Sequence, residues 1–147
     1  MNKADNDNYF MKVALQEAQK SAQMGEIPIG AIIVSEGEIL ARCHNLTETL
    51  CDPTAHAEMQ AITTATAALG GKYLPQCTIY VTIEPCPMCA AALYWAQIGR
   101  VVYGAKDDKR GYSTISASLL HPKTEVAEGV LKDECSQIMT SFFKKLR

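Results

Sequence analysis

Apolar residues recur along the chain at two different spacings, and the change from one spacing to the other marks the predicted helices and strands. Over residues 9–24 the spacing is helical, which predicts a helix that ends at Gly25. Residues 29–34 and 38–42 are rich in strand-forming side chains and flank a Ser-Glu-Gly turn. The first third of the chain is therefore expected to form a helix followed by a β-hairpin.

The rest of the chain alternates between the two spacings. Asp52 suits an N-cap and Pro53 the first helical position, so a helix is expected from there to about Leu69. The remaining predicted elements are a strand over 78–83, a helix over 88–97, a strand over 100–105, an irregular loop over 106–124 and a terminal helix over Lys132–Lys145. Such alternation is typical of an α/β layered domain with a mixed sheet.

Length and composition favour one ordinary globular domain over residues 1–147. Apolar residues make up 48% of the chain and charged residues 20%. On the terminal helix the apolar side is formed by Ile138, Met139, Phe142 and Phe143, and both phenylalanines are expected in the core. No apolar run is long enough to span a bilayer and the N-terminus is polar, so a soluble cytoplasmic protein is expected, with no membrane partner.

The net charge of −2 is unevenly distributed along the chain. Residues 1–99 carry 5 Lys and Arg against 10 Asp and Glu, whereas residues 100–147 carry 9 against 6. The basic bias of the C-terminal part suits contact with a phosphate backbone. From charge alone, a solvated helix face explains it equally well.

Two of the six cysteines, Cys86 and Cys89, are closely spaced, in the segment TIEPCPMCAAALYW. Pro87 can open a helix whose N-cap is Cys86, which places Cys89 one turn further on and brings both sulfurs together. The partial positive charge of a helix N-terminus favours thiolates there. This C-x-x-C is either a redox pair or half of a zinc site, and its context favours zinc. The remaining cysteines are expected to be free and buried: Cys43, Cys51, Cys77 and Cys135.

The segment His56-Ala57-Glu58 supplies the other half of the predicted site. With both cysteines, His56 would give zinc three ligands and leave one position open, which is the catalytic arrangement. Cys51 is the nearest candidate for a fourth, closing ligand; the others are Cys43, His44 and His121. Two thiolates leave zinc with little net charge, so a general base is needed, and Glu58 is the candidate. H-x-E followed by P-C-x-x-C matches the general signature of zinc nucleobase deaminases.

The segments HAEMQAI, TIEPCPMC and IGRVVYGAKDDKRG together resemble the cytidine deaminase-like superfamily, and within it the bacterial tRNA-specific adenosine deaminases. The likeness extends to EIPIGAIIV, to the HN pair before DPTAHAE and to the ending EGVLKDECSQIMTSFFKKLR. It implies a three-layer α/β/α sandwich with a central mixed five-stranded sheet, one zinc ion per subunit and a homodimer. It also implies hydrolysis of adenosine to inosine at the wobble position of a tRNA anticodon stem-loop.

The same resemblance implies roles for individual residues. His56, Cys86 and Cys89 would hold zinc, Glu58 would move protons, and Glu84 would brace the metal corner. The implied contacts to the substrate are Asn45, Pro28, Ile29, Gly30 and Ala57 around the base, Lys106, Asp107 and Lys109 in a loop that meets the anticodon, and Lys144, Lys145 and Arg147 at the C-terminal end.

Several alternatives stay open at this point. Asn45 is equally suited to capping a turn after the hairpin, and Asp107 to a solvated turn. The segment YWAQIGR resembles guanine deaminases, so deamination of a free base, guanine or cytosine, is the alternative activity. A zinc-stabilised binding module without catalysis is the third possibility.

Overall fold

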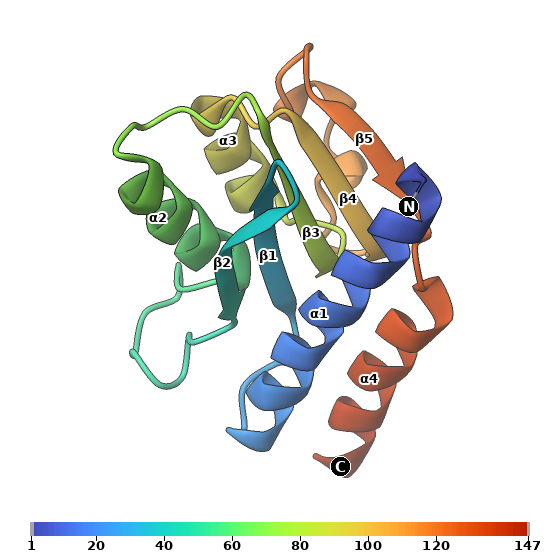
Figure 1. The fold of residues 1–147 in the computed structure, drawn as a ribbon. Coiled ribbons are helices and arrows are strands. Elements are labelled where there is room, and N and C mark those ends of the chain that lie inside the picture. Colours follow the sequence, from blue (N-terminus) through green and yellow to red (C-terminus); the bar gives the residue numbers. More distant parts are fainter. Residues whose placement is uncertain (1, 147) are drawn as a thin grey trace.

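The computed structural model describes residues 2–146, which fold into α-helices packed around one mixed sheet (Figure 1). The elements in chain order are α1 (Lys3–Gln23), β1 (Gly30–Ser35), β2 (Glu38–His44), α2 (Ala57–Leu69), β3 (Cys77–Ile83), α3 (Pro87–Ala96), β4 (Arg100–Ala105), the 3-10 turns η1 (Tyr112–Thr114) and η2 (Ala117–Leu119), β5 (Glu125–Glu128) and α4 (Lys132–Lys145). None of the helices in this described range is both long and apolar enough to cross a membrane.

The sheet has five strands in the order β2-β1-β3-β4-β5. β1 runs antiparallel to both of its neighbours, whereas β3, β4 and β5 are parallel to one another. Helices α1 and α4 cover one face of the sheet, and α2 and α3 cover the other (Figure 1). This arrangement confirms the predicted α/β/α sandwich with a mixed five-stranded sheet.

The central strands send alternate side chains into two hydrophobic clusters, as the two-residue period of a strand requires. In β3, Ile79 and Val81 belong to the cluster beneath α2 and α3. Tyr80, between them, belongs to the cluster beneath α1 and α4. Because both faces of β3 are covered, its ends are the places where polar side chains can gather at an opening.

The predicted start of the second helix is wrong. Helix α2 begins at Ala57, with His56 as its N-cap, rather than at Pro53. The Asp52 carboxylate accepts hydrogen bonds from the backbone N–H and the hydroxyl of Thr54, both at 2.8 Å, and so stabilises a turn before the helix. An Asp-Pro pair suits a turn as well as a helix start, and the turn leaves His56 free to lie at the helix terminus.

Two further differences concern the C-terminal part. β5 was not predicted from the residue pattern, because its four residues, EVAE, have no apolar alternation, and the strand forms by pairing with β4. The predicted core position is wrong for Phe143, whose side chain on α4 is 38% exposed, whereas Phe142 is half-buried. The region expected to be irregular contains only the two 3-10 turns before β5.

Candidate metal centre

Two helix N-termini meet just beyond the carboxyl end of β3. Cys86 is the N-cap of α3 and Pro87 its first residue, which confirms the predicted corner. Cys89 follows one turn later, and His56 lies across from both cysteines as the N-cap of α2. His56 Nδ1 is 3.6 Å from Cys86 Sγ and 3.5 Å from Cys89 Sγ. All three ligand atoms lie within 4.8 Å of one another, so a single ion can reach them.

This donor set fits zinc, which commonly takes one imidazole nitrogen and two thiolate sulfurs as ligands in proteins. Within residues 2–146, no fourth His, Cys, Asp or Glu ligand atom joins the group. Cys51, the predicted candidate for a closing ligand, is exposed, and its thiol donates to the Glu48 carbonyl at 3.7 Å. Three protein ligands with one open position form the catalytic type of zinc site.

The other scattered cysteines differ in burial. Cys77 and Cys135 are buried, as predicted. The prediction is wrong for Cys51, which is exposed, and for Cys43, which is half-buried. Cys43 lies on β2, a strand at the edge of the sheet, where neighbouring side chains cover it less completely.

Hydrogen bonding concentrates negative charge on one sulfur of the corner. The hydrogen bond from Cys89 lowers the pKa of the Cys86 thiol to about 4, against an opposing effect of burial. The same hydrogen bond, together with burial, raises the pKa of Cys89. The hydrogen bond to Cys86 also raises the pKa of His56. Metal binding at such a group is coupled to proton release, because thiolates and neutral imidazole are the ligating forms.

Glu58 is the second residue of α2, and its side chain is only 4% exposed. Burial raises the pKa of this carboxyl group to about 7. Its neighbours include the Cys89 thiol, with which it shares a hydrogen bond, and the buried Ala57. A carboxyl group with a pKa near neutrality can both accept and return a proton.

Asn45, which follows β2, is buried. Its backbone N–H donates to the Ile29 carbonyl at 3.1 Å, and its side-chain Nδ2 donates to Thr47 Oγ1 at 3.3 Å. Among the described residues, no donor reaches the side-chain oxygen of Asn45. Pro28 is buried and Ile29 half-buried beside it. Gly30 instead lies against α1. A Cβ at this position would clash with the Ala14 carbonyl of that helix.

Glu84 fastens a loop to the metal corner. Its carboxylate accepts hydrogen bonds from the Asp107 N–H at 3.1 Å, the Ser113 N–H at 3.0 Å and the Ser113 hydroxyl at 2.7 Å. The loop approaches so closely that a side chain on Gly111 would clash with the Glu84 carboxylate. Gly111 and Ser113 were not singled out from the sequence, since nothing local marks them as partners of a glutamate before Pro85.

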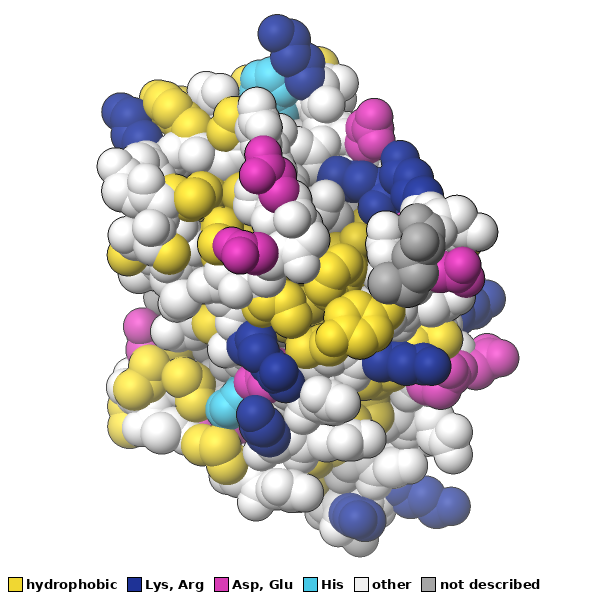
Figure 2. Space-filling model, in the orientation of Figure 1, with side chains coloured by type: hydrophobic (Ala, Val, Ile, Leu, Met, Phe, Trp, Pro, Cys, Tyr) yellow, Lys and Arg dark blue, Asp and Glu magenta, His cyan; other side chains and the backbone are white. Residues whose placement is uncertain are grey.

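The predicted cationic residues lie outside the metal centre. Asp107 Oδ1 accepts hydrogen bonds from the backbone N–H groups of Lys109, at 3.1 Å, and Arg110, at 2.9 Å, so it stabilises a turn. Lys106 and Lys109 are exposed in this loop. Lys144 and Lys145 are exposed at the end of α4. Figure 2 shows Lys and Arg side chains spread over this face of the molecule, with some of this colour at its lower end. Arg147 lies outside the described residues.

Comparison with known proteins gives the class of this site. Residues 4–105 match the family model described as the cytidine and deoxycytidylate deaminase zinc-binding region. This match covers every residue of the His-Cys-Cys group and Glu58. Together with the open three-ligand centre and the α/β/α fold, it defines a zinc-dependent deaminase.

Similar proteins narrow the class further. A tRNA-specific adenosine deaminase of Bacillus subtilis (strain 168) is 47% identical over 146 residues, which cover 96% of this chain and 91% of the relative. A solved structure from a study of A-to-I editing by tRNA:A34 deaminases at the wobble position superimposes with a TM-score of 0.82 at 41% identity, over 88% of this chain and 98% of that one. Guanine deaminase from Bacillus subtilis gives a TM-score of 0.67 at 39% identity, over 80% and 71%. The chain belongs to the tRNA-specific adenosine deaminases of this zinc-dependent family.

Proposed function

We propose that this protein hydrolyses the 6-amino group of adenosine at the wobble position of a tRNA anticodon, which gives inosine and ammonia. One observation carries the proposal: the convergence of His56, Cys86 and Cys89 beside the buried Glu58 carboxyl, in a chain whose relatives act on tRNA adenosine. We assign this activity to a single domain over residues 1–147. A tRNA substrate agrees with a cytoplasmic location.

In this mechanism His56, Cys86 and Cys89 hold the zinc ion. When bound there, zinc acidifies water and so supplies a nucleophile near neutral pH. Glu58 accepts a proton from the water that attacks C6 and delivers it to the purine ring. The Glu58 carboxylate then takes the proton of the new hydroxyl group at C6 and passes it to the amino group, which leaves as ammonia while the C6 carbonyl of inosine forms. Its burial and its pKa of about 7 suit both transfers, because the proton-accepting and proton-donating forms are close in free energy.

Substrate recognition requires that the target adenine leaves the base stack of the RNA and enters the pocket. Bases of a single-stranded anticodon loop can be splayed into a pocket at a smaller free-energy cost than paired bases. The free side-chain oxygen of Asn45 would accept a hydrogen bond from the target nucleoside, and Pro28, Ile29 and Ala57 would line the pocket. The exposed ammonium groups of the 106–109 loop and of the end of α4 would contact phosphates. Gly30 would contribute backbone only, at the first position of β1.

We also propose a homodimer that forms through the outer side of α3. Trp95, on α3, is 76% exposed, which is unusual for so large an aromatic ring, and Tyr94 lies next to it at 5.9 Å between ring centroids. Exposed aromatic residues are enriched at protein interfaces. Sedimentation of the wild type should give the mass of two chains, and Trp95→Glu should give one. A wild type that sediments as a monomer at micromolar concentration would rule out this dimer.

Deamination of a free base is the second candidate, and the likeness to a guanine deaminase favours it. The two are separated by incubating zinc-loaded protein with an anticodon stem-loop that carries adenosine at the wobble position, and separately with guanine and cytosine. We expect inosine in the stem-loop and no turnover of the free bases. A matched stem-loop with its only adenosine in the paired stem should stay unmodified.

Other outcomes of this incubation would each favour a different function. Turnover of guanine or cytosine without inosine formation would favour the free-base deaminase. Tight stem-loop binding without any turnover, at one zinc per chain, would favour the binding module.

A further inference from the structure

Another buried carboxylate lies outside the metal centre and has no role in the proposed mechanism. Glu26, in the connection between α1 and β1, is completely buried, with 0% of its surface exposed. Its Oε1 accepts a hydrogen bond from the Glu48 N–H at 3.0 Å. Its Oε2 accepts from both the N–H and the hydroxyl of Thr49, at 2.7 and 2.6 Å. All of these donors belong to one loop, residues 46–55.

This loop joins the residue proposed to contact the base to one of the metal ligands. Its ends are tied together, because the Leu46 N–H donates to the Ala55 carbonyl at 3.0 Å. Asn45 precedes the loop, and its side chain donates to Thr47 Oγ1, two positions before Thr49. His56 follows the loop directly. A movement of the loop would therefore move the Asn45 amide.

Hydrogen bonds within the loop, such as the one from the Leu50 N–H to the Leu46 carbonyl at 2.9 Å, give it its shape, and among the described residues Glu26 is the hydrogen-bond partner that ties residues 48 and 49 to the rest of the fold. Residues 48–51 are all exposed, so they contribute few apolar contacts. Burial alone would raise the pKa of Glu26, but the hydrogen bonds from Thr49 and Glu48 outweigh it and lower the pKa. The group is thus ionised at neutral pH, and hydrogen bonds to a charged acceptor are about twice as strong as neutral ones.

We propose that Glu26 is a positioning residue for substrate binding, which anchors the 46–55 loop and so aims the side-chain oxygen of Asn45 at the target nucleoside. The inference rests on the proposed function. The hydrogen bonds of the Glu26 carboxylate go to the loop and not to His56, Cys86, Cys89 or Glu58. Its loss should therefore weaken substrate binding and leave the chemical step intact.

The test is Glu26→Gln, which keeps the size of the side chain but removes the charge and turns an NH2 group toward N–H donors. KM for the stem-loop should rise at least about tenfold, the effect of losing roughly one charge-assisted hydrogen bond. The kcat should stay within about threefold, and zinc should remain bound. Thr49→Val removes only the hydroxyl donor and should raise KM by a smaller factor, about threefold. Glu38→Gln, an exposed glutamate at the start of β2, is the matched control and should change neither constant.

Two further readouts separate positioning from a merely structural role. In Glu26→Gln, the amide hydrogens of Glu48 and Thr49 should exchange faster with solvent, while those of β3 should not. In an Asn45→Ala background, Glu26→Gln should raise KM no further, because both changes act through the same amide.

An unchanged KM in Glu26→Gln would overturn the proposal, as would a full additional effect in the Asn45→Ala background. If Glu26→Gln does not fold, Thr49→Val tests the proposal in its place. An unchanged KM in that variant would contradict the role of Glu26 as the anchor of the 46–55 loop. Failure of the proposed function would show differently, as absence of inosine with the wild type. The dissociation constant of the stem-loop then replaces KM in the same comparison.

Discussion

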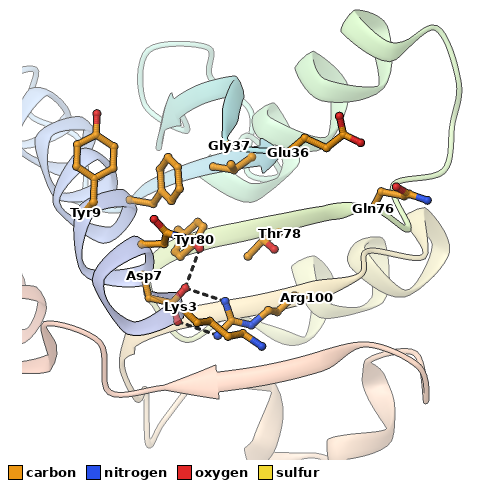
Figure 3. A pocket seen from close by; sticks show the side chains of 12 residues that line it. Lys3, Asp7, Tyr9, Glu36, Gly37, Gln76, Thr78, Tyr80 and Arg100 are labelled. Atoms are coloured by element: carbon orange, nitrogen blue, oxygen red, sulfur yellow. Dashed lines mark hydrogen bonds and ion pairs between the residues drawn. The ribbon is translucent and has the colours of Figure 1, made fainter. Parts of the chain in front are cut away.

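The two ends of the central sheet both carry buried ionisable side chains, but their pairing differs. Near the amino end of β4, Asp7 accepts hydrogen bonds from both terminal nitrogens of Arg100, at 2.7 and 2.8 Å, and from the Tyr80 hydroxyl at 2.8 Å (Figure 3). A groove of about 510 Å³ opens beside this cluster. The buried Asp7 carboxylate and the half-buried Arg100 guanidinium pair with each other, so the cluster ties α1 to β3 and β4.

At the carboxyl end of β3, three of the four ionisable groups form anions, and the fourth is the His56 imidazole. Two thiols, an imidazole and the Glu58 carboxyl lie together, and the described residues supply no Lys or Arg to balance them. Groups that ionise to anions and face one another need a cation to become stable ligands. The Asp7–Arg100 pair is therefore arranged for stability, whereas the thiols and the imidazole of the metal centre are arranged to bind a cation.

The largest expected effect comes from removing one ligand at the metal end. Cys89→Ser should lose zinc and lower turnover by more than about hundredfold, since even partners that only orient metal ligands are worth about 10- to 100-fold. Metal analysis and inosine formation on the stem-loop check this. Cys51→Ser is the matched control and should keep both zinc and activity. Loss of zinc in Cys51→Ser would contradict the open three-ligand site.

Disrupting the Asp7–Arg100 pair should lower the stability of the fold and leave the activity unchanged. Asp7→Asn leaves the half-buried Arg100 without its counter-charge and should lower the free energy of unfolding by about 3 kcal/mol, the lower end of the range for a buried pair. Urea unfolding followed by circular dichroism measures the change. The kcat per folded molecule should equal that of the wild type. A lower kcat at unchanged stability would mean that the two ends are not separate in function.

The contribution of Asp7 should also depend on pH in a defined direction. Burial alone would raise the pKa of Asp7, but hydrogen bonds from Arg100 and Tyr80 outweigh it and lower the pKa from 3.8. A lowered folded-state pKa means that the stabilisation is fully present above the unfolded pKa and is lost as pH falls through the folded one. The stability difference between wild type and Asp7→Asn should therefore be constant from pH 7 to about 5 and shrink toward pH 3. A difference that grows on acidification would contradict this assignment.

The smallest expected effect concerns the C-terminal lysines. Replacing Lys144 and Lys145 by Gln should weaken stem-loop binding a few-fold and reduce the slope of log K against log salt by about 0.7 for each lost phosphate contact. Fluorescence anisotropy over a salt series measures the slope. Lys72→Gln, an exposed position between α2 and β3, is the control and should leave the slope unchanged. An unchanged slope in the double variant would place the RNA elsewhere.

The metal end could be predicted from the sequence because its constraints are local. Pro87 fixes the start of α3, and therefore Cys86 as its N-cap, and the three-residue spacing places Cys89 beside it. The position of His56 as the N-cap of α2 was harder to predict, because Asp52 and Pro53 suit either a helix start or the turn that they form.

Long-range pairing could not be predicted in the same way. β5 exists because β4 offers an edge, and its own residues carry no strand pattern. Nothing in the sequence sets Glu26 apart from other acidic residues, because its partners lie 22 and 23 positions away in an exposed loop. The Asp7–Arg100 pair spans 93 positions and is likewise a product of the fold.

The most direct test of the account measures zinc and product in one preparation of Glu58→Gln. We predict one zinc per chain, an unchanged fold and inosine formation in the wobble stem-loop slowed by a factor on the order of 10² to 10⁴, the usual contribution of a general acid–base group. Wild-type rates in this variant would contradict the role of Glu58. A fully zinc-loaded wild type that leaves the wobble adenosine unchanged would contradict the activity itself.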